Sequence, residues 1–367
     1  MALSLYKTLG GKTGCHQLSE AFYTRVARDP ILRPLFPGKT LTCAIHEFAA
    51  FLAQFLGGPS EDSQRRWWLS LQESHRRFKI GEKERTAWLA NMAEAFNDVQ
   101  LPPRIATDLL RFFEHSSAYV VNSPADEQPI PHAELSHRWA GQLRLDEAVA
   151  AIRAGNTSEA IRLMESCARS VQCGLLALMI RHASADFNDY VRARLAADPA
   201  LTQERFAGRT LLHDAAAAGN LAIVELLLSL GTDPNTLDAG RHTPLYSVAN
   251  ECGAKGAGAV VTALVRAGAE VDAHDGVKNC TALHMAARRD HKEIAQALLE
   301  CGADIEARDS LGETPLRRAV NCNKLEIASL LITRGADAHC IGSKGLTPLQ
   351  AARSPGMKQL LHRHANP

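Results

Sequence analysis

The sequence predicts an all-α protein made of two differently built parts, a compact helical domain followed by an elongated stack of helical repeats. Through residues 4 to 122, apolar side chains recur with the period of about 3.6 that is typical of amphipathic helices. From position 210 onward, five threonines open similar segments, spaced 33, 38, 33 and 33 residues apart. Fifteen of the twenty aromatic residues lie in 1–123, so the composition changes between the two parts.

Length and charge bound the class of protein. A chain of 367 residues is long enough for two or three domains. With 41 basic and 40 acidic residues, it lacks the basic excess expected for binding nucleic acid or an anionic membrane. No apolar run reaches the roughly 20 residues of a spanning helix, and the N-terminus lacks the apolar core of a secretory signal. Nine cysteines without a C-x-x-C pair favour reduced thiols. We therefore expect a cytoplasmic protein without a nucleic-acid or membrane partner.

Four apolar stripes predict the helices of the first domain. Pro30, the GGPS segment at 57–60 and Pro102–Pro103 mark where helices end or begin. The stripes are Leu18, Phe22 and Val26; Phe48, Phe51, Leu52 and Phe55; Trp88, Met92, Ala95 and Val99; and Ile105, Leu109 and Phe112.

Spacing alone does not select a ligand among the four histidines His16, His46, His75 and His115 of this domain. If Ala44 faces the interior, His46 lies about 200° round the helix from it and points away. His75 instead lies in a short segment leading into the Trp88 helix, where its ring can enter the space between helices. The alternative is an ordinary surface or core histidine.

A linker and a transitional region separate the two parts. The segment VVNSPADEQPIPH, with three prolines, predicts a linker over 124–134. Residues 135–205 contain helix pairs like those of the repeats but lack their turn signature. We interpret them as degenerate repeats that cap the array, with a separate small helical domain as the alternative.

The recurring threonine, proline and glycine positions of the repeats over 206–367 each suit the start or the end of a helix. Each threonine precedes a helix, where its hydroxyl can cap free amides. The prolines that follow three of them suit the first helical turn, and glycine suits the left-handed turn that ends the second helix. These positions are Thr210, Thr243, Thr281, Thr314 and Thr347; Pro244, Pro315 and Pro348; and Gly231, Gly268, Gly302 and Gly335.

These T-P-L-x-x-A and L-L-x-x-G-A-D segments resemble ankyrin repeats, which implies a solenoid that binds a protein partner. In that family, histidines placed like His213 and His284 hydrogen-bond to backbone between repeats, so we expect them to be structural. The GAKGAG insertion at 253–258 lengthens the second spacing. Because a phosphate-binding loop requires a preceding strand, we interpret this insertion as a longer loop between two helices.

The N-terminal domain, residues 1–123, resembles the second group of truncated hemoglobins. The shared segments are LYKTLGGKTG, AFYTRVARDPILRPLFPG, FLAQFLGGP, HRRFKIG and AWLANM. The resemblance implies a 2-over-2 helical fold, with His75 as the proximal iron ligand of heme b. It also implies that Tyr23 and Trp88 donate hydrogen bonds to a bound ligand in the distal pocket.

Further pocket residues follow from the same resemblance. Phe36 matches the aromatic residue that contacts the macrocycle, and the heme pocket is expected to comprise Phe36, Ala44, Phe48, Phe78, Ile80 and Met92. Ser74 stands where the family often has a propionate-binding arginine. Arg76, Arg77 or Lys79 can take that role through charge pairing with the carboxylates.

The expected function is binding of oxygen or another diatomic gas (O₂, CO or NO) at a His75-ligated heme, with the ankyrin repeats binding an unknown protein. No catalytic residue is assigned, and a binding protein is favoured over an enzyme. One alternative is a heme enzyme, an NO dioxygenase or a peroxidase-like protein, that depends on an external reductase. The other is a scaffold whose globin domain no longer holds heme.

Overall fold

The structure is a computed structural model that describes residues 5–36, 40–58, 75, 80–120, 133–167, 169–276, 278–342 and 345–365. It divides into two compact units, Met1–Gln172 and Cys173–Pro367. Within the described residues, every regular element is helical except for one two-stranded hairpin, which confirms the predicted all-α class. No helix in these ranges is long and apolar enough to cross a membrane.

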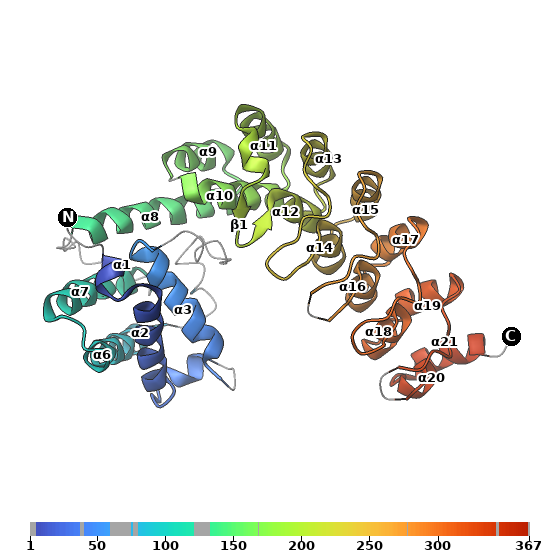
Figure 1. Ribbon diagram of the computed structural model, residues 1–367, viewed down its shortest axis with the longest axis horizontal. Helices are drawn as coiled ribbons and strands as arrows, with labels where there is room; N and C mark the ends of the chain where they lie inside the picture. Colours follow the sequence, from blue (N-terminus) through green and yellow to red (C-terminus); the bar gives the residue numbers. More distant parts are fainter. Residues whose placement is uncertain are drawn as a thin grey trace. The chain divides into compact units, whose positions relative to one another are not determined.

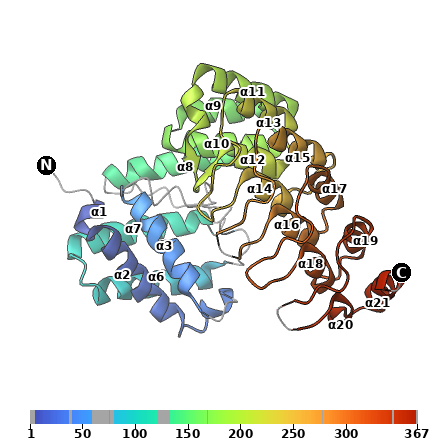
Figure 2. The same ribbon diagram turned by 45° about the vertical axis from the view of Figure 1, so that its right-hand side comes forward.

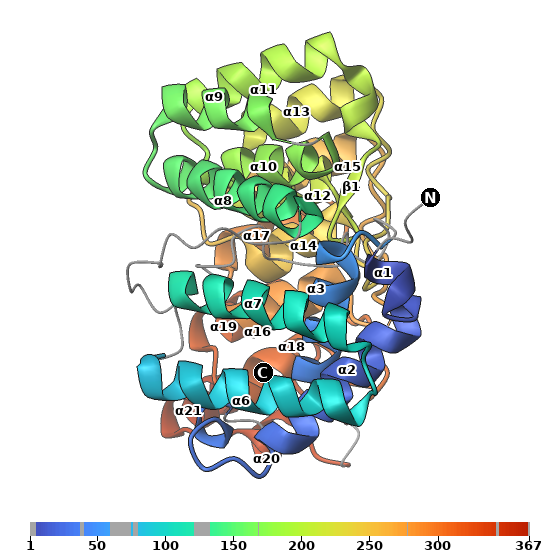
Figure 3. The same cartoon turned by 90° about the vertical axis from the view of Figure 1, so that its left-hand side faces the viewer.

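The first unit contains the helices that the apolar stripes predict (Figures 1 and 3). Helix α2 packs against both α3 and α6, and α6 lies beside α7. Its elements are α1 (Leu5–Thr8), α2 (Gly11–Val26), η1 (Arg33–Leu35), α3 (Thr42–Phe55), α6 (Glu82–Asp98), α7 (Pro103–Val120), α8 (Ala133–Arg153) and α9 (Thr157–Ser166).

Local chemistry explains where these helices begin and end. Gly10 adopts a left-handed conformation, with φ 93°, before α2. Gly14 sits so close to the preceding turn that a Cβ there would lie 1.7 Å from the Leu9 carbonyl oxygen, so the LGGKTG segment requires glycine. Pro103 opens α7 as predicted. The Gly81 amide donates to the Glu84 carboxylate (2.9 Å) at the start of α6, and this bond lowers the pKa of Glu84.

The second unit is a stack of antiparallel helix pairs, which Figure 2 shows from yellow-green to red. Helix α10 begins in the first unit and ends in the second. The elements that follow the first unit are α10 (Arg169–His182), α11 (Ala185–Ala197), η2 (Pro199–Thr202), β1 (Arg205–Phe206), β2 (Arg209–Thr210), α12 (Leu211–Ala218), α13 (Leu221–Ser229), α14 (Pro244–Glu251), α15 (Ala257–Arg266), α16 (Ala282–Arg289), α17 (Lys292–Glu300), α18 (Pro315–Asn321), α19 (Leu325–Thr333), α20 (Pro348–Ala351) and α21 (Pro355–Ala365).

The predicted capping positions of the repeats are confirmed: all five threonines are the N-cap residues of their helices, and the three prolines occupy the first turn. The hydroxyls of Thr243, Thr314 and Thr347 accept an amide of the first turn as predicted, whereas those of Thr210 and Thr281 contact a histidine ring instead. Gly231, Gly268, Gly302 and Gly335 are left-handed, with φ between 80° and 98°. The hairpin β1–β2 was not predicted from the sequence; its two-residue turn at Ala207–Gly208 has positive φ at both positions.

The two repeat histidines bond to the neighbouring repeat, as expected. His213 Nε2 lies 3.0 Å from the carbonyl of His242, and His284 Nε2 lies 2.9 Å from the carbonyl of Glu313. In each ring, Nδ1 accepts the amide of the preceding N-cap threonine (3.3 and 3.2 Å). The rings are therefore neutral and carry their proton on Nε2. Burial is the main cause that lowers the pKa of both histidines.

The GAKGAG insertion lies between the two helices of one repeat, after α14 and at the start of α15. The amides of Gly256 and Gly258 donate to the two carboxylate oxygens of Glu293 on α17, at 3.0 and 3.2 Å. Glu293 thereby supplies the negative charge that a helix N-terminus favours. A side chain of the next repeat thus occupies these amides, which agrees with a lengthened loop rather than a phosphate-binding loop.

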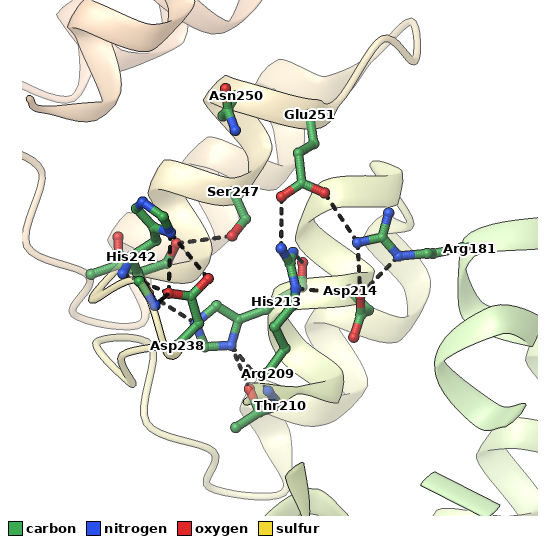
Figure 4. A network of polar contacts seen from close by, with 12 residues as sticks. Arg181, Arg209, Thr210, His213, Asp214, Asp238, His242, Ser247, Asn250 and Glu251 are labelled. Carbon is green, nitrogen blue, oxygen red and sulfur yellow. Dashed lines mark hydrogen bonds and ion pairs between the residues drawn. The ribbon is translucent and has the colours of Figure 1, made fainter. Parts of the chain in front are cut away.

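A partly buried ion cluster joins consecutive repeats at the start of the array (Figure 4). Arg181 contacts Asp214 (2.8 Å) and Glu251 (3.1 Å), and Arg209 contacts the same two carboxylates at 3.5 and 2.7 Å. Burial by itself raises the pKa of Glu251, but the two arginines outweigh it and lower the pKa. The cluster holds α10, α12 and α14 together. Removal of either arginine would leave Asp214 and Glu251 with less positive charge to balance their own, which would destabilise this contact.

Candidate functional site

The site predicted in the first unit begins with the register of α2 against α3. The fully buried Ser19 hydroxyl of α2 donates to the carbonyl of Ile45 on α3 (2.7 Å). This bond crosses the interface one turn before Tyr23 on α2 and directly after Ala44 on α3. It therefore fixes the position of α2 along α3, and with it the placement of Tyr23 opposite Phe48.

Four of the predicted residues meet in one aromatic cluster, which we define as Tyr23, Phe36, Phe48 and Trp88. The ring of Tyr23 lies edge-on to Phe36, with centroids 5.5 Å apart, and edge-on to Phe48, at 6.2 Å. The indole of Trp88 lies edge-on to Phe48 at 6.1 Å. These edge-to-face contacts come from α2, the residue after η1, α3 and α6, so four separate segments converge on one apolar volume.

The turn between α2 and η1 holds Phe36 in this cluster. The Asp29 carboxylate accepts the amides of Ile31 (2.8 Å) and Leu32 (2.9 Å), which shapes the turn. The side-chain amide of Asn91 on α6 donates to the same carboxylate (2.7 Å). Burial raises the pKa of Asp29, but these three hydrogen bonds outweigh it and lower the pKa. Asp29 thereby fastens the segment that carries Phe36 to the helix that carries Trp88.

An ion pair joins α2 to α6, the helix that carries Trp88. Arg25 on α2 makes two hydrogen bonds to the Asp98 carboxylate on α6, at 2.7 and 2.8 Å. These bonds lower the pKa of Asp98 and raise that of Arg25. The pair is exposed to solvent, so it orients the helices more than it stabilises them.

Ala44 and Met92 complete the predicted residues that the structure brings together. Both belong to the hydrophobic core around Tyr23, where Met92 is fully buried. Ala44, Phe36, Phe48 and Trp88 are only half-buried, and therefore keep part of their apolar surface accessible. They pack against fully buried residues of the same core, such as Leu18 and Phe22.

The other predicted residues are less completely described. His75 is helical and half-buried, and Ile80 is half-buried just before α6. Phe78, Arg76, Arg77 and Lys79, as well as Ser74, lie outside the described residues. His46 is exposed on α3, as its helical position predicts. The assignment of His75 as the iron ligand therefore stays a prediction.

An open hollow of about 440 Å³ lies at the corner between α2 and η1, lined among others by Arg28, Asp29, Arg33 and Phe36. It is largely open to solvent, and three of its lining side chains are charged. Because sites for apolar groups are lined chiefly by hydrophobic and aromatic side chains, the aromatic cluster is the better candidate for the site.

Two residues of this region were not predicted from the sequence: Phe113, whose ring centroid lies 5.2 Å from that of Trp88, and Asn91, whose side-chain amide donates to Asp29. Phe22 was predicted as part of an apolar stripe, but its contact with Trp88, also at 5.2 Å, was not. Trp139 on α8 also belongs to this core, although it was expected to lie beyond the domain boundary. It is the sole tryptophan after residue 123, but nothing in its local sequence indicates that it packs on α7.

The residues present fit a heme group. Phe36, Phe48 and Trp88 are half-buried, and their remaining apolar surface could pack against the macrocycle. A phenol and an indole provide donors within the same apolar volume, and His75 offers an imidazole on a separate segment.

Comparison with known families agrees with both parts of the fold. Residues 4–121 match the model of the bacterial-like globin family. Residues 207–239 match an ankyrin repeat, and residues 245–341 match a model of three ankyrin repeats.

Individual relatives show the same division. Group 2 truncated hemoglobin YjbI of Bacillus subtilis (strain 168) is 34% identical over 111 residues, which cover 30% of this chain and 83% of that protein. Two-on-two hemoglobin-3 of Arabidopsis thaliana is 31% identical over 121 residues, covering 32% of this chain and 69% of that protein. Ankyrin repeat and SOCS box protein 11 of Danio rerio is 41% identical over 105 residues, but only 34% of its length is covered.

The match covers more than two thirds of each of the two hemoglobins, whereas it covers about one third of the ankyrin-containing relative. Together with the helices and the aromatic cluster, these matches establish the family of the N-terminal domain. The chain belongs to the truncated hemoglobins of the bacterial-like globin family and joins this globin domain to C-terminal ankyrin repeats.

Proposed function

We propose that the globin domain binds heme b through His75 and takes up a diatomic gas (O₂, CO or NO), while the ankyrin repeats bind a protein partner in the cytoplasm. The observation that carries this proposal is the convergence of Tyr23, Phe36, Phe48 and Trp88 in one apolar cluster of a globin-family domain. Heme, when bound, supplies the iron that coordinates the gas.

The residues of the chain divide the remaining tasks. The His75 imidazole would hold the cofactor through its iron. The Tyr23 hydroxyl and the Trp88 indole N–H would donate hydrogen bonds to the gas and favour a ligand that carries partial negative charge. The apolar residues that would exclude water are Phe36, Ala44, Phe48, Phe78, Ile80 and Met92. Basic side chains among Arg76, Arg77 and Lys79 would pair with the propionates.

The ankyrin half supports the second part of the proposal. Two large apolar side chains, Leu311 and Ile341, are 55% and 59% exposed in successive loops between repeats. Ankyrin repeats bind partners with such loops and with the adjoining helices. The proposed partner is a protein, because no basic excess favours nucleic acid.

The absorption spectrum of the purified chain tests the heme part of the proposal. We expect a strong Soret band that shifts on reduction and again on addition of carbon monoxide. His75→Ala removes the proximal ligand and should abolish or alter the band. His46→Ala is the matched control, because it removes an exposed imidazole of the same domain and should leave the spectrum unchanged.

Absence of a Soret band after the chain has been supplied with hemin would overturn the proposal and leave a globin-shaped scaffold. An unaltered spectrum in His75→Ala would instead place the ligand on another residue.

A further inference from the structure

Helix α8 takes part in the hydrophobic core of the globin domain. Its Trp139 is 5% exposed and belongs to the same core as Tyr23 and Met92. The Trp139 ring lies edge-on to Phe112 of α7, with centroids 5.8 Å apart, and edge-on to His115, at 5.5 Å. The part of α8 around Trp139 is therefore packed onto α7, although it was predicted to belong to the degenerate repeats.

The other end of the same helix belongs to a different core. Ala148, Val149 and Ile152 of α8 are all at most 2% exposed, and α8 packs against α9. On α9, Ala160 and Met164 are fully buried. One helix of 21 residues thus contributes its first half to the globin core and its second half to a helix pair that precedes the repeats.

The connection between α8 and α9 is short and closed. Gly155 is left-handed, with φ 69°. Its amide donates to Ile152, and the amide of Asn156 donates to Ala151, both at 3.0 Å, which is the Schellman pattern. The Asn156 side chain then caps α9. Because α8 is continuous and ends in this tight turn, no flexible loop separates Trp139 from α9.

A chain of ring contacts leads from the proposed gas site to Trp139. Trp88 contacts Phe113 (5.2 Å), Phe113 contacts Phe112 (5.3 Å), and Phe112 contacts Trp139 (5.8 Å). Phe112 is 1% and Phe113 3% exposed, so these rings are closely packed. Close-packed side chains transmit small shifts, because the surrounding atoms leave no space for them to relax.

We propose that α8 is a coupling helix, through which the packing state of the globin core sets the stability of the α8–α9 pair that leads into the repeats. The part of this inference that concerns heme and gas rests on the proposed function. The part that concerns packing rests on the contacts of Trp139, Phe112 and Ile152 alone.

Hydrogen exchange of the full-length chain, followed by mass spectrometry, tests the coupling. Trp139→Ala should accelerate amide exchange in α9 by about tenfold or more, although α9 begins eighteen residues further along the chain. Phe112→Leu, a substitution on α7, should act in the same direction. Arg111→Ala changes an exposed side chain of α7 next to Phe112 and should leave α9 within about twofold of the original rate.

The amides of α17 in the second unit report whether unfolding is local. An equal rise of exchange in α17 would mean that Trp139→Ala unfolds the whole chain. The milder Trp139→Phe variant then tests the coupling: a smaller acceleration is expected in α9 and none in α17. Faster exchange in α7 and the start of α8 with unchanged α9 would overturn the proposal.

The ligand half of the inference has its own readout. Addition of hemin and carbon monoxide should slow exchange in α9 of the unaltered chain, and Trp139→Ala should lose this effect while keeping its Soret band. An unchanged α9 despite a normal Soret band overturns transmission of the ligand state. Absence of the band in the unaltered chain overturns the proposed function, and the substitutions then judge the packing part by themselves.

Discussion

Tyr23 and Trp88 each combine a ring that packs with a polar atom that can donate. Their rings both contact Phe22 and Phe48, so these residues would be needed for the core even without a ligand. The donor role is therefore separable from the packing role only by a substitution that keeps a six-membered ring and removes the polar atom.

Trp88→Phe provides this separation for the indole. Loss of the N–H donor should raise the O₂ dissociation rate by roughly 10- to 100-fold, since a hydrogen bond to a charged group contributes about 1.5–3 kcal/mol. The CO dissociation rate should change much less, because bound CO carries little negative charge. Flash photolysis and stopped-flow mixing measure both rates.

Phe51→Leu is the control for packing, because Phe51 stacks on Phe48 at 6.1 Å and carries no donor. It should affect O₂ and CO alike. If Trp88→Phe also changed both rates equally, the indole would act through packing and not as a donor.

At the scale of the element, the repeat helices meet one requirement in different ways. The third helical position has to satisfy groups near the N-cap, and it holds His213 in α12 and His284 in α16. In α20, Gln350 forms the same capping box, accepting the Thr347 amide at 2.9 Å. A neutral amide thus substitutes for imidazole within this very array.

The histidine version carries a pH dependence. Burial lowers the pKa of His213 and His284 in the folded state, so the unfolded chain binds more protons near the ordinary value of 6.5. Their contribution to stability is fully present above pH 6.5 and is lost as the pH falls through the folded-state pKa. The contact with Asp238 raises the pKa of His242, whose contribution is instead lost as the pH rises above 6.5.

Replacing both residues, His213→Gln with His284→Gln, should flatten the loss of stability of the repeat unit below pH 6.5. Urea unfolding followed by circular dichroism at pH 7.5, 6.5 and 5.5 measures this slope. His339→Gln is the control, because His339 is exposed and should leave the slope unchanged. An equally steep decline in the double variant would assign the acid sensitivity to other groups.

At the scale of the whole molecule, the two compact units differ in the contacts that stabilise them. The first unit has a core of aromatic rings contributed by helices far apart in sequence. In the second unit, each helix pair packs chiefly on its neighbours, as in α12 with α14, α14 with α16 and α16 with α18. Such an array behaves as a sum of repeat and interface terms.

This difference predicts separate unfolding transitions. All four tryptophans lie within Met1–Gln172, so tryptophan fluorescence reports the first unit alone, whereas circular dichroism reports both. Leu283→Ala in the fully buried interior of α16 should cost about 2–5 kcal/mol and shift the dichroism transition to lower temperature. The fluorescence midpoint should stay unchanged. A shift of equal size in both signals would indicate one cooperative molecule instead of two units.

The sequence by itself determined the helices, their ends and the repeat architecture. These features depend on neighbouring residues, such as Thr314 before Pro315, the left-handed Gly302 or the stripe that contains Phe48. The apolar period and the capping residues act within one or two helical turns, so they can be predicted from the sequence alone. The globin resemblance likewise named Tyr23, Phe36, Phe48 and Trp88, which the structure brings together, whereas the role of His75 stays a prediction.

Only the tertiary structure decided the contacts between distant segments. Trp139 packs on Phe112, Glu293 caps α15 from the next repeat, and Asn91 holds Asp29, yet no local pattern distinguishes these side chains from exposed ones. Their partners lie 27 to 62 residues away along the chain, and the pairing exists only once the helices have packed. The free energy of such contacts comes from desolvation and close packing, which depend on the three-dimensional neighbourhood and not on the order of residues.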